Sequence, residues 1–264
     1  MEKTKVAVIG GGNMGGAITT ALSKKEEYEV FLYERTTEKA KALLDECHIT
    51  LLSSISEATD MDVVIIALKP QNLPSFYEKL APLSPSLFIS ICAGVDLNTL
   101  KENLKSDSVI RFMPNIGAKV GKSVTAVAAE GVANCLVELS MDIARSFGDA
   151  FLLDESLFSA FIGISGSAIA FVFDFMHNIA MAGVREGIPY NKALSIVSGT
   201  LESAALLQKA TGKGAIELET MVCSPRGTTI EGVKTLTEGG FASIVQDAVE
   251  ATVRKSEEMT RNAK

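Results

Sequence analysis

The sequence predicts a doubly wound α/β sheet followed by an all-helical region. Across residues 1–153, short β-rich runs alternate with helical patterns, whereas residues 154–264 show only helical periodicity interrupted by Gly and Pro. The third observation is a Gly-rich turn directly after the first β-rich run. We therefore expect two domains, 1–153 and 154–264, which fits the length of 264 residues.

Five near-continuous apolar runs predict parallel strands that are covered on both faces. They are KVAVI (5–9), EVFLY (29–33), DVVIIAL (62–68), LFISI (87–91) and SVIRF (108–112). Between them, helical patterns occupy 13–23, 37–46, 73–80 and 97–104. VTAVAA and AFLL predict late strands on either side of a helix at 133–147.

The second half of the chain predicts a helical domain. Helical patterns cover 155–163, 167–186, 190–209, 215–223, 228–238 and 241–263. Ala and Gly are frequent at helix positions, which permits close helix packing and favours an intimate oligomer. The longest apolar stretch, 160–173, is shorter than the roughly 20 residues that span a bilayer. It therefore predicts a helix buried on most sides, within the chain or against another subunit.

Composition excludes several classes of partner. The net charge of −7 and the pI near 5.1 argue against nucleic acid or an anionic membrane. The N-terminal apolar run is too short for a signal peptide. The four cysteines are far apart and form no Cys-x-x-Cys motif, so we expect no metal site and no redox pair. We expect a cytoplasmic protein.

The turn after the first strand reads VIGGGNMGGA and contains Gly10-x-Gly12-x-x-Gly15. Between a strand and a helix, these glycines allow a tight turn, close approach to a pyrophosphate and helix-on-strand packing. The first helical residues, Asn13 and Met14, present free N–H groups to the phosphates. We therefore expect a dinucleotide; a Gly-rich turn without a ligand is the alternative.

The end of the second strand gives opposing signals about the cofactor. Glu34 stands where a carboxylate binds the adenosine ribose 2′-OH of NAD. Arg35 and Thr36 follow at once, and an Arg with a hydroxyl suits the extra phosphate of NADP. The choice between NADPH and NADH stays open at this stage.

Three further loops follow predicted strands and should rim the same crevice, because ligands of doubly wound sheets bind at the carboxyl ends of strands. The loops are ALKPQN (67–72), SICAG (90–94) and MPN (113–115). Lys69 is placed to touch the cofactor ribose, although a solvated lysine is the alternative. The candidate residues of these loops are Ala67, Lys69, Pro70, Ala93, Gly94 and Asn115.

The stretch MVCSPRGTTIEGV (221–233) combines hydroxyls, an Arg and a helix start. Such a loop points hydroxyl and backbone N–H groups at a small anion. It is also a well-capped helix start. The two interpretations describe one structure.

These motifs resemble those of pyrroline-5-carboxylate reductases over almost the whole chain. GGGNMG, LKPQ, ISICAGV, RFMPN, GISGS and MVCSPRGTTIEGV occur in the order seen in that family. The resemblance implies an N-terminal Rossmann domain and a C-terminal helical domain that interlocks with a partner to form a dimer; in several members dimers assemble into decamers. It also implies reduction of the cyclic imine 1-pyrroline-5-carboxylate to L-proline with NADPH or NADH.

By the same resemblance, the loop at 221–233 binds the imino-acid substrate. The Thr229 hydroxyl would hydrogen-bond the ring nitrogen, and Ser224 would help to hold the substrate. Backbone N–H groups of Gly227, Thr228 and Thr229 would hold the carboxylate. Asn115 is the further candidate for substrate binding.

The chain departs from the family pattern near the expected substrate pocket. Arg226 stands where the family loop, usually Ser-Pro-Gly-Gly or Ser-Lys-Gly-Gly, has Gly. His177 stands where an acidic residue is usual. The other departures are Ile116 and Gly117 in place of Thr-Pro, and Ala168, Ile169, Ala170 and Phe171 in place of Gly-Pro-Ala-Tyr. Arg226 either grips a second carboxylate or points outwards. His177 either forms a buried polar pair with Asp174 or donates a proton to the product amine.

Three alternatives remain. A β-hydroxyacid dehydrogenase shares the two-domain layout, but Val172 stands where that family carries its proton-transferring Lys, so carbonyl chemistry is poorly served. A reductase of another cyclic imino acid and a non-catalytic nucleotide-binding paralogue both fit the altered pocket.

Overall fold

The computed structural model describes residues 2–262 and contains two compact units, which are described separately below. The first unit comprises the chain up to Gly166 together with the segment from Val253, and the second is Ser167–Thr252. This division differs from 153/154 because Phe158 and Phe161, which follow that point, are buried in the core of the first unit.

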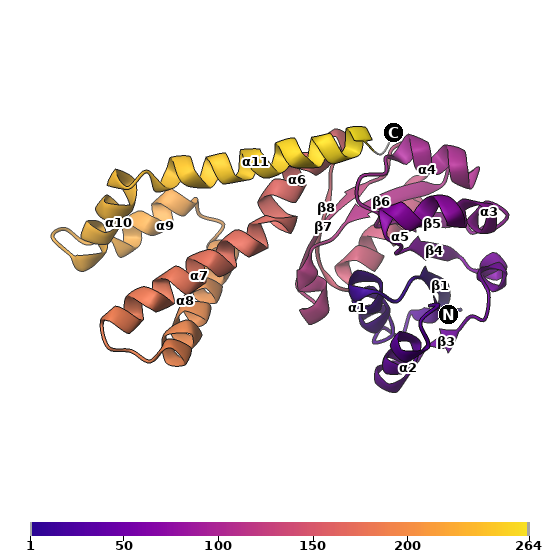
Figure 1. Cartoon of the computed structure of the whole chain (residues 1–264), viewed down its shortest axis with the longest axis horizontal. Helices are drawn as coiled ribbons and strands as arrows, with labels where there is room; N and C mark the ends of the chain where they lie inside the picture. Colours follow the sequence, from indigo (N-terminus) through magenta and orange to yellow (C-terminus); the bar gives the residue numbers. More distant parts are fainter. Residues whose placement is uncertain (1, 263–264) are drawn as a thin grey trace. The chain divides into compact units, whose positions relative to one another are not determined.

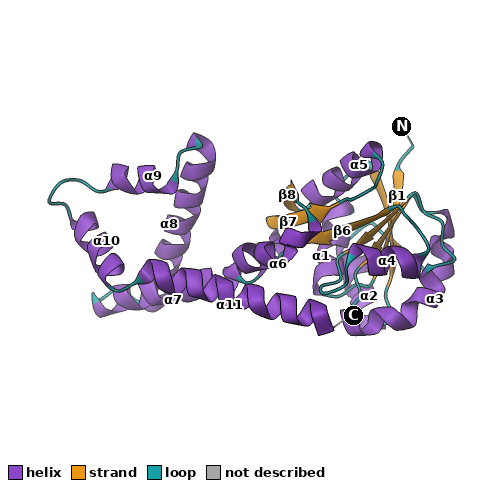
Figure 2. Cartoon of the chain, turned by 90° about the horizontal axis from the view of Figure 1, so that it is seen from above, coloured by secondary structure: helices purple, strands orange, loops and turns teal. Residues whose placement is uncertain are grey.

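The first unit is built on one eight-stranded sheet with the order β3-β2-β1-β4-β5-β6-β7-β8 (Figures 1 and 2). All neighbouring strands are parallel except β6 and β7. The bounds are β1 Thr4–Ile9, β2 Tyr28–Tyr33, β3 Thr50–Leu51, β4 Val63–Ile66, β5 Leu87–Ser90, β6 Val109–Met113, β7 Ser123–Ala128 and β8 Gly148–Leu152. All seven predicted strands are confirmed; the two-residue β3 was not predicted because it is too short to show a pattern.

Helices cover both faces of the sheet, which explains the continuous apolar runs. In β1, Ala7 and Ile9 belong to one core, whereas Val6 and Val8 belong to the other. Side chains from α1 (Asn13–Leu22), α2 (Thr37–Glu46) and α5 (Asn134–Arg145) join the second of these cores. Side chains from α3 (Tyr77–Leu80), α4 (Leu97–Leu104) and α6 (Phe158–Phe161) join the first. The doubly wound prediction is confirmed.

The helix predicted at 73–80 is only partly α-helical. Residues Pro70–Phe76 form a 3₁₀ segment, η2, and α3 supplies a single turn after it. Pro74 lies inside η2 and has no N–H to donate to an i−4 carbonyl, so the α-helical ladder cannot form there. A second 3₁₀ segment, η1 (Ile55–Asp60), precedes β4.

From Glu155 to residue 262 the described chain is helical and contains no strand. The elements are η4 (Glu155–Leu157), α6, a π-helical segment η5 (Ile162–Gly166), α7 (Ala168–Arg185), α8 (Tyr190–Thr211), α9 (Ala215–Val222), α10 (Thr228–Glu238) and α11 (Phe241–Asn262). All the predicted helical segments are confirmed. Ala263, with which the last of them was expected to end, lies outside the described residues.

The long apolar helix is exposed rather than buried. Ile164 of η5 is 67% exposed. Phe173 of α7 is 62% exposed, because α7 packs on α8 through a small cluster of Ala180, Ala193 and Val197. The prediction that this helix is buried on most sides is therefore wrong for the single chain. Glu155–Arg185 forms one helical run that is long and apolar enough to cross a membrane by length and composition alone. The run is longer than the apolar stretch 160–173 suggested.

Candidate functional site

The Gly-rich loop joins β1 to α1 at the point where the strand order reverses. Gly10 has φ 112°, and a Cβ there would lie 2.6 Å from the carbonyl oxygen of Ala67. A Cβ on Gly15 would lie 1.9 Å from the Gly10 oxygen. Gly12, in contrast, faces open space at the start of α1, and no described side chain caps that helix. The loop thus fits a phosphate, since it offers uncapped N–H groups and room for close approach at Gly12 and Asn13.

A cleft of about 840 Å³ extends from this loop along α1 and α2. Three of the residues expected at the cofactor, Gly12, Asn13 and Lys69, line this cleft together with Gly11. Its ionisable lining residues are Lys24, Lys25, Lys39, Lys69, Lys119 and Glu46. In a chain of net charge −7, this excess of lysine makes the cleft a local site for an anionic ligand.

Lys119 is the cleft residue beside the phosphate loop that was not expected from the sequence. Its Nζ donates to the Asn13 Oδ1 at 3.3 Å, beside the phosphate loop. The 3₁₀ segment η3 (Ile116–Val120), capped by Asn115, brings it there. The available signal was its place in a loop that follows a strand, because such loops rim the crevice.

Glu34 is held against the Gly-rich loop. Its Oε2 accepts the Gly11 N–H at 2.7 Å, and its Oε1 accepts the Thr36 N–H at 2.8 Å. The guanidinium of Arg35 lies over the Phe76 ring, 5.2 Å from the centroid. The predicted ribose-binding carboxylate therefore sits at the Gly-rich loop, and half of its acceptor capacity is already used.

The remaining predicted cofactor residues divide between two places. Ala67 contacts the glycines of the loop, and Met14 packs on the adjoining core. Pro70 begins η2 and Ala93 is exposed. Gly94 has φ 75° and lines a second cavity instead of the cofactor cleft.

Asn115 is buried and largely satisfied within the chain. Its Oδ1 accepts from the N–H groups of Gly117 at 3.1 Å and Val124 at 3.3 Å, and its Nδ2 donates to the Ser165 Oγ at 3.0 Å. The geometry gives Asn115 a positioning role and leaves one amide hydrogen for a ligand. The neighbouring loop accepts only glycine at Gly117, where a Cβ would lie 2.4 Å from the Lys122 oxygen.

The loop at 221–233 forms a turn directly before α10. The Gly227 N–H donates to the Ser224 carbonyl oxygen at 3.0 Å. It is therefore not free to bind a carboxylate, contrary to the expectation from the sequence. A Cβ on Gly227 would lie 2.3 Å from the Ser224 Oγ, so that hydroxyl lies close over the helix start. No described side chain caps α10, whose first residues are Thr228 and Thr229. Arg226 is exposed and has φ 57°, a conformation that favours glycine.

His177 does not pair with Asp174 in a buried site. Its Nδ1 lies 2.9 Å from the Tyr190 hydroxyl oxygen, and the two rings meet edge to face. Both His177 and Asp174 are exposed in the chain. The expected pair was wrong because the hairpin of α7 and α8 brings Tyr190 to His177.

Comparison with known proteins decides the family. A family model described as "Pyrroline-5-carboxylate reductase dimerisation" matches residues 155–259, and one described as "NADP oxidoreductase coenzyme F420-dependent" matches residues 5–94. The pyrroline-5-carboxylate reductase of Aquifex aeolicus is 34% identical, and the match covers 97% of each chain. The chain belongs to the pyrroline-5-carboxylate reductase family.

Solved structures of pyrroline-5-carboxylate reductases have the same fold. The Coxiella burnetii reductase superposes with a TM-score of 0.92 at 25% identity, covering 98% of this chain and 99% of that chain. The Plasmodium falciparum reductase, solved with NADP bound, has a TM-score of 0.85 at 26% identity over 98% and 99% of the two chains. The Rossmann-like sheet unit and the helical unit are therefore the architecture of this family.

The match to a reductase dimerisation domain explains the exposed apolar helices. Large apolar side chains of the helical unit are exposed, among them Ile216 at 74%, Ile244 at 64% and Phe173 at 62%. Exposure of many large apolar side chains on one unit indicates an interaction surface. The apolar run Glu155–Arg185 lies wholly within the matched domain, so association with a second copy of this reductase-family chain accounts for it.

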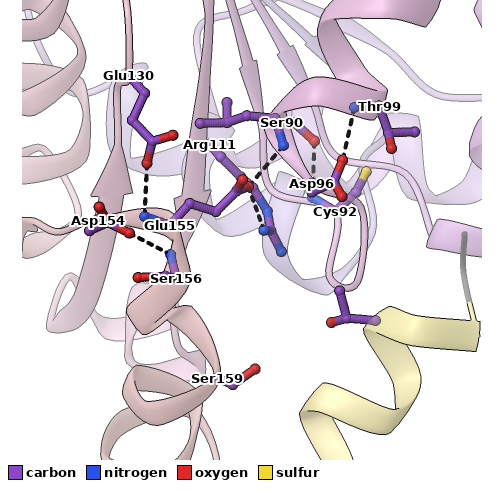
Figure 3. A network of polar contacts seen from close by, with 12 residues as sticks. Ser90, Cys92, Asp96, Thr99, Arg111, Glu130, Asp154, Glu155, Ser156 and Ser159 are labelled. Atoms are coloured by element: carbon purple, nitrogen blue, oxygen red, sulfur yellow. Dashed lines mark hydrogen bonds and ion pairs between the residues drawn. The ribbon is translucent and has the colours of Figure 1, made fainter.

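A polar cluster lies at the second cavity, the one lined by Gly94 (Figure 3). The Arg111 Nη1 donates to the Glu155 Oε1 at 2.7 Å, and the same oxygen accepts the Leu97 N–H at the start of α4. Burial raises the pKa of the nearby Cys92 thiol, which donates to the Leu68 oxygen. Cys92 is thus a neutral thiol. Within residues 2–262, no group of three or more His, Cys, Asp or Glu side chains could hold a metal ion.

Proposed function

We propose that the chain reduces the cyclic imine 1-pyrroline-5-carboxylate to L-proline with NAD(P)H, as a step of proline biosynthesis. The observation that carries the proposal is the near full-length similarity to named reductases, joined to a phosphate-binding loop of the required shape. The absence of a Lys at Val172 argues against the hydroxyacid dehydrogenase alternative.

The sheet unit would hold the cofactor. The glycine turn and the uncapped N-terminus of α1 suit the pyrophosphate, and Lys119 and Lys69 add positive charge along the cleft. Once bound, the nicotinamide supplies a hydride to the imine carbon. Gly10 and Gly15 serve this binding by letting the backbone turn and letting α1 pack closely.

The turn before α10 would hold the substrate. The N–H groups of Thr228 and Thr229 are suited to the substrate carboxylate, since they lie at an uncapped helix start. In this assignment the Thr229 hydroxyl hydrogen-bonds the ring nitrogen, and the Ser224 hydroxyl helps to hold the substrate over the turn. Gly227 contributes by leaving space for that hydroxyl, and exposed Arg226 is assigned no substrate contact.

Positioning would supply much of the rate. A protonated imine is already electrophilic, so the chief task of the chain is to orient the imine towards the nicotinamide. The demand for general acid catalysis is then modest. Thr229 and Ser224 suit this task because a hydroxyl orients a ring nitrogen without being ionised at neutral pH. Asn115 is assigned to positioning, since its amide holds the segment after β6.

The test is the initial rate of NADH and NADPH oxidation with 1-pyrroline-5-carboxylate, for the wild type beside Thr229→Ala and Thr229→Ser. The proposal expects turnover by the wild type, a loss of at least tenfold in Thr229→Ala, and partial retention in Thr229→Ser. Binding of cofactor without turnover would contradict the proposal and favour the two alternatives, which other cyclic imino acids then separate. An undiminished Thr229→Ala would contradict the assignment of the loop alone.

We further propose that residues 154–264 act as the substrate and dimerisation domain of a homodimer, which assembles into a decamer in the cytoplasm. The dimerisation match over 155–259 supports the dimer, and the acidic net charge supports the lack of nucleic-acid and membrane partners. Light scattering during size-exclusion chromatography tests the assembly. A monomer at micromolar concentration would contradict it.

A further inference from the structure

The Glu34 carboxylate accepts hydrogen bonds from the backbone N–H groups around the expected adenosine ribose site. Its Oε2 accepts from the Gly11 N–H of the first loop at 2.7 Å, and its Oε1 accepts from the Thr36 N–H of the second loop at 2.8 Å. In doubly wound nucleotide-binding sheets, the ribose lies at the end of the second strand, between these two loops. Gly11 permits this approach, since a Cβ there would lie 3.3 Å from the Glu34 Oε2.

The carboxyl is ionised at neutral pH. Partial burial by itself would raise its pKa, but the hydrogen bonds from Thr36 and Gly11, together with the positive charge of Lys39, lower the pKa below the ordinary value of 4.5. A negative charge is therefore fixed at the end of β2.

A carboxylate in this position treats the two cofactors differently. A ribose hydroxyl can donate to it, because two of its roughly four acceptor sites remain free. A 2′-phosphate would meet a like charge at short range and would find the Gly11 and Thr36 N–H groups already taken. From this geometry we infer that Glu34 is the residue that selects NADH over NADPH in this chain.

The cations near Glu34 do not reverse the preference. Arg35 lies over the Phe76 ring at 5.2 Å and Lys79 lies near the same ring at 5.8 Å, so the guanidinium already has a partner. The positive charge of Lys39 acts on Glu34 itself and lowers the pKa of its carboxyl. Lys119 lies at Asn13, beside the site of the pyrophosphate, which both cofactors share.

The inference rests on the proposed cofactor-dependent function and deepens it. The family includes a member that was solved with NADP bound, so the choice of cofactor has to be decided for each chain by its own residues. In this chain the deciding group is a single carboxylate, that of Glu34, which accepts one hydrogen bond from each of two backbone N–H groups.

The experiment measures the Kd of NADH and of NADPH by isothermal titration calorimetry, on the full chain and without imine. The wild type is expected to bind NADH at least tenfold more tightly than NADPH. Glu34→Gln, which removes the charge, should narrow the ratio at least fivefold. Glu34→Ser, which also frees both N–H groups, should bring NADPH to equal or tighter binding.

Glu38→Gln is the matched control, because it removes the same charge from the exposed first turn of α2 and should leave both Kd values unchanged. A wild type that binds NADPH at least as tightly as NADH overturns the inference while leaving the proposed reductase intact. An unchanged ratio in both Glu34 variants also overturns it. Failure to bind either cofactor overturns the inference and the proposed function together.

Discussion

Alanine substitutions at Gly12 and Gly15 should separate cofactor binding from folding. The two glycines are three residues apart in one loop, but only Gly15 is crowded. A Cβ at Gly15 would lie 1.9 Å from the Gly10 oxygen and 2.8 Å from the Ala67 Cβ, whereas a Cβ at Gly12 would have no atom within 4 Å. One substitution should therefore damage the fold, and the other should block only the ligand.

The size of the Gly15→Ala effect follows from the contact distance. Cβ atoms essentially never lie closer than 3.0 Å to such an atom, so α1 must retreat from the Gly10 backbone by about 1.1 Å (3.0 − 1.9). Overpacking of this kind costs about 1–3 kcal/mol or more. For a chain of this size each kcal/mol lowers the Tm by roughly 2–4 °C, so we expect a fall of about 2–12 °C.

Gly12→Ala should leave the free energy of unfolding within about 1 kcal/mol of the wild type. Alanine restricts the unfolded chain, which stabilises the protein, but it is a poorer residue than glycine at the N-cap of α1, which destabilises it. Gly12 already has φ −68° and ψ −170°, which alanine adopts without strain. Its methyl group would nevertheless project towards the pyrophosphate, and the Kd for NADH should rise at least tenfold.

Thermal unfolding followed by circular dichroism, at one protein concentration, measures the stability of both variants, and isothermal titration calorimetry measures the Kd. A Gly12→Ala protein that binds NADH like the wild type would refute the placing of the pyrophosphate at this loop. A Gly15→Ala protein with an unchanged Tm would refute the packing argument.

Three further predictions concern stability. Arg226→Gly should raise the Tm, because φ 57° costs an L-residue about 1 kcal/mol that glycine avoids. Glu155→Ala should lower the free energy of unfolding, measured in urea, by about 3–5 kcal/mol, since it leaves buried Arg111 unpaired. The control Glu130→Ala removes an exposed hydrogen-bond acceptor and should cost less than about 1 kcal/mol. Similar losses in both variants would contradict a buried ion pair. The folded-state pKa of Glu34 is depressed, so its stabilising contribution is present above 4.5 and is lost as the pH falls through the folded pKa. Glu34→Gln should accordingly be less stable than the wild type at neutral pH, with a difference that shrinks in acid, and a pH-independent difference would contradict this account.

The features that sequence analysis predicted correctly are those set by near neighbours in the chain. The strands were predicted because both faces of the sheet are covered, which makes each run continuously apolar. The glycine turn was predicted because its steric requirements fall at fixed spacings. The helix at 73–80 was predicted less well, since Pro74 changes its type without changing its hydrophobic pattern.

The site residues required longer-range information. Spacing along one helix suggested Asp174 as the partner of His177, but Tyr190 of the next helix holds that position. Lys119 contacts Asn13 across 106 positions of sequence, and no local pattern marks such a pair. Exposure of the apolar helices was also not predicted, because a hydrophobic pattern does not say whether the same chain or a second copy covers it.

The sequence by itself determined the doubly wound sheet, the phosphate-binding turn and the family likeness, because each depends on residue types at short, fixed spacings. Only the tertiary structure decided what the ionisable groups do. It placed the Glu34 carboxylate on Gly11, 23 positions away, and showed that the Gly227 N–H is taken by Ser224. The physical reason is that hydrogen bonds and charges act over a few ångströms of space, and chain folding alone sets which groups come within that distance.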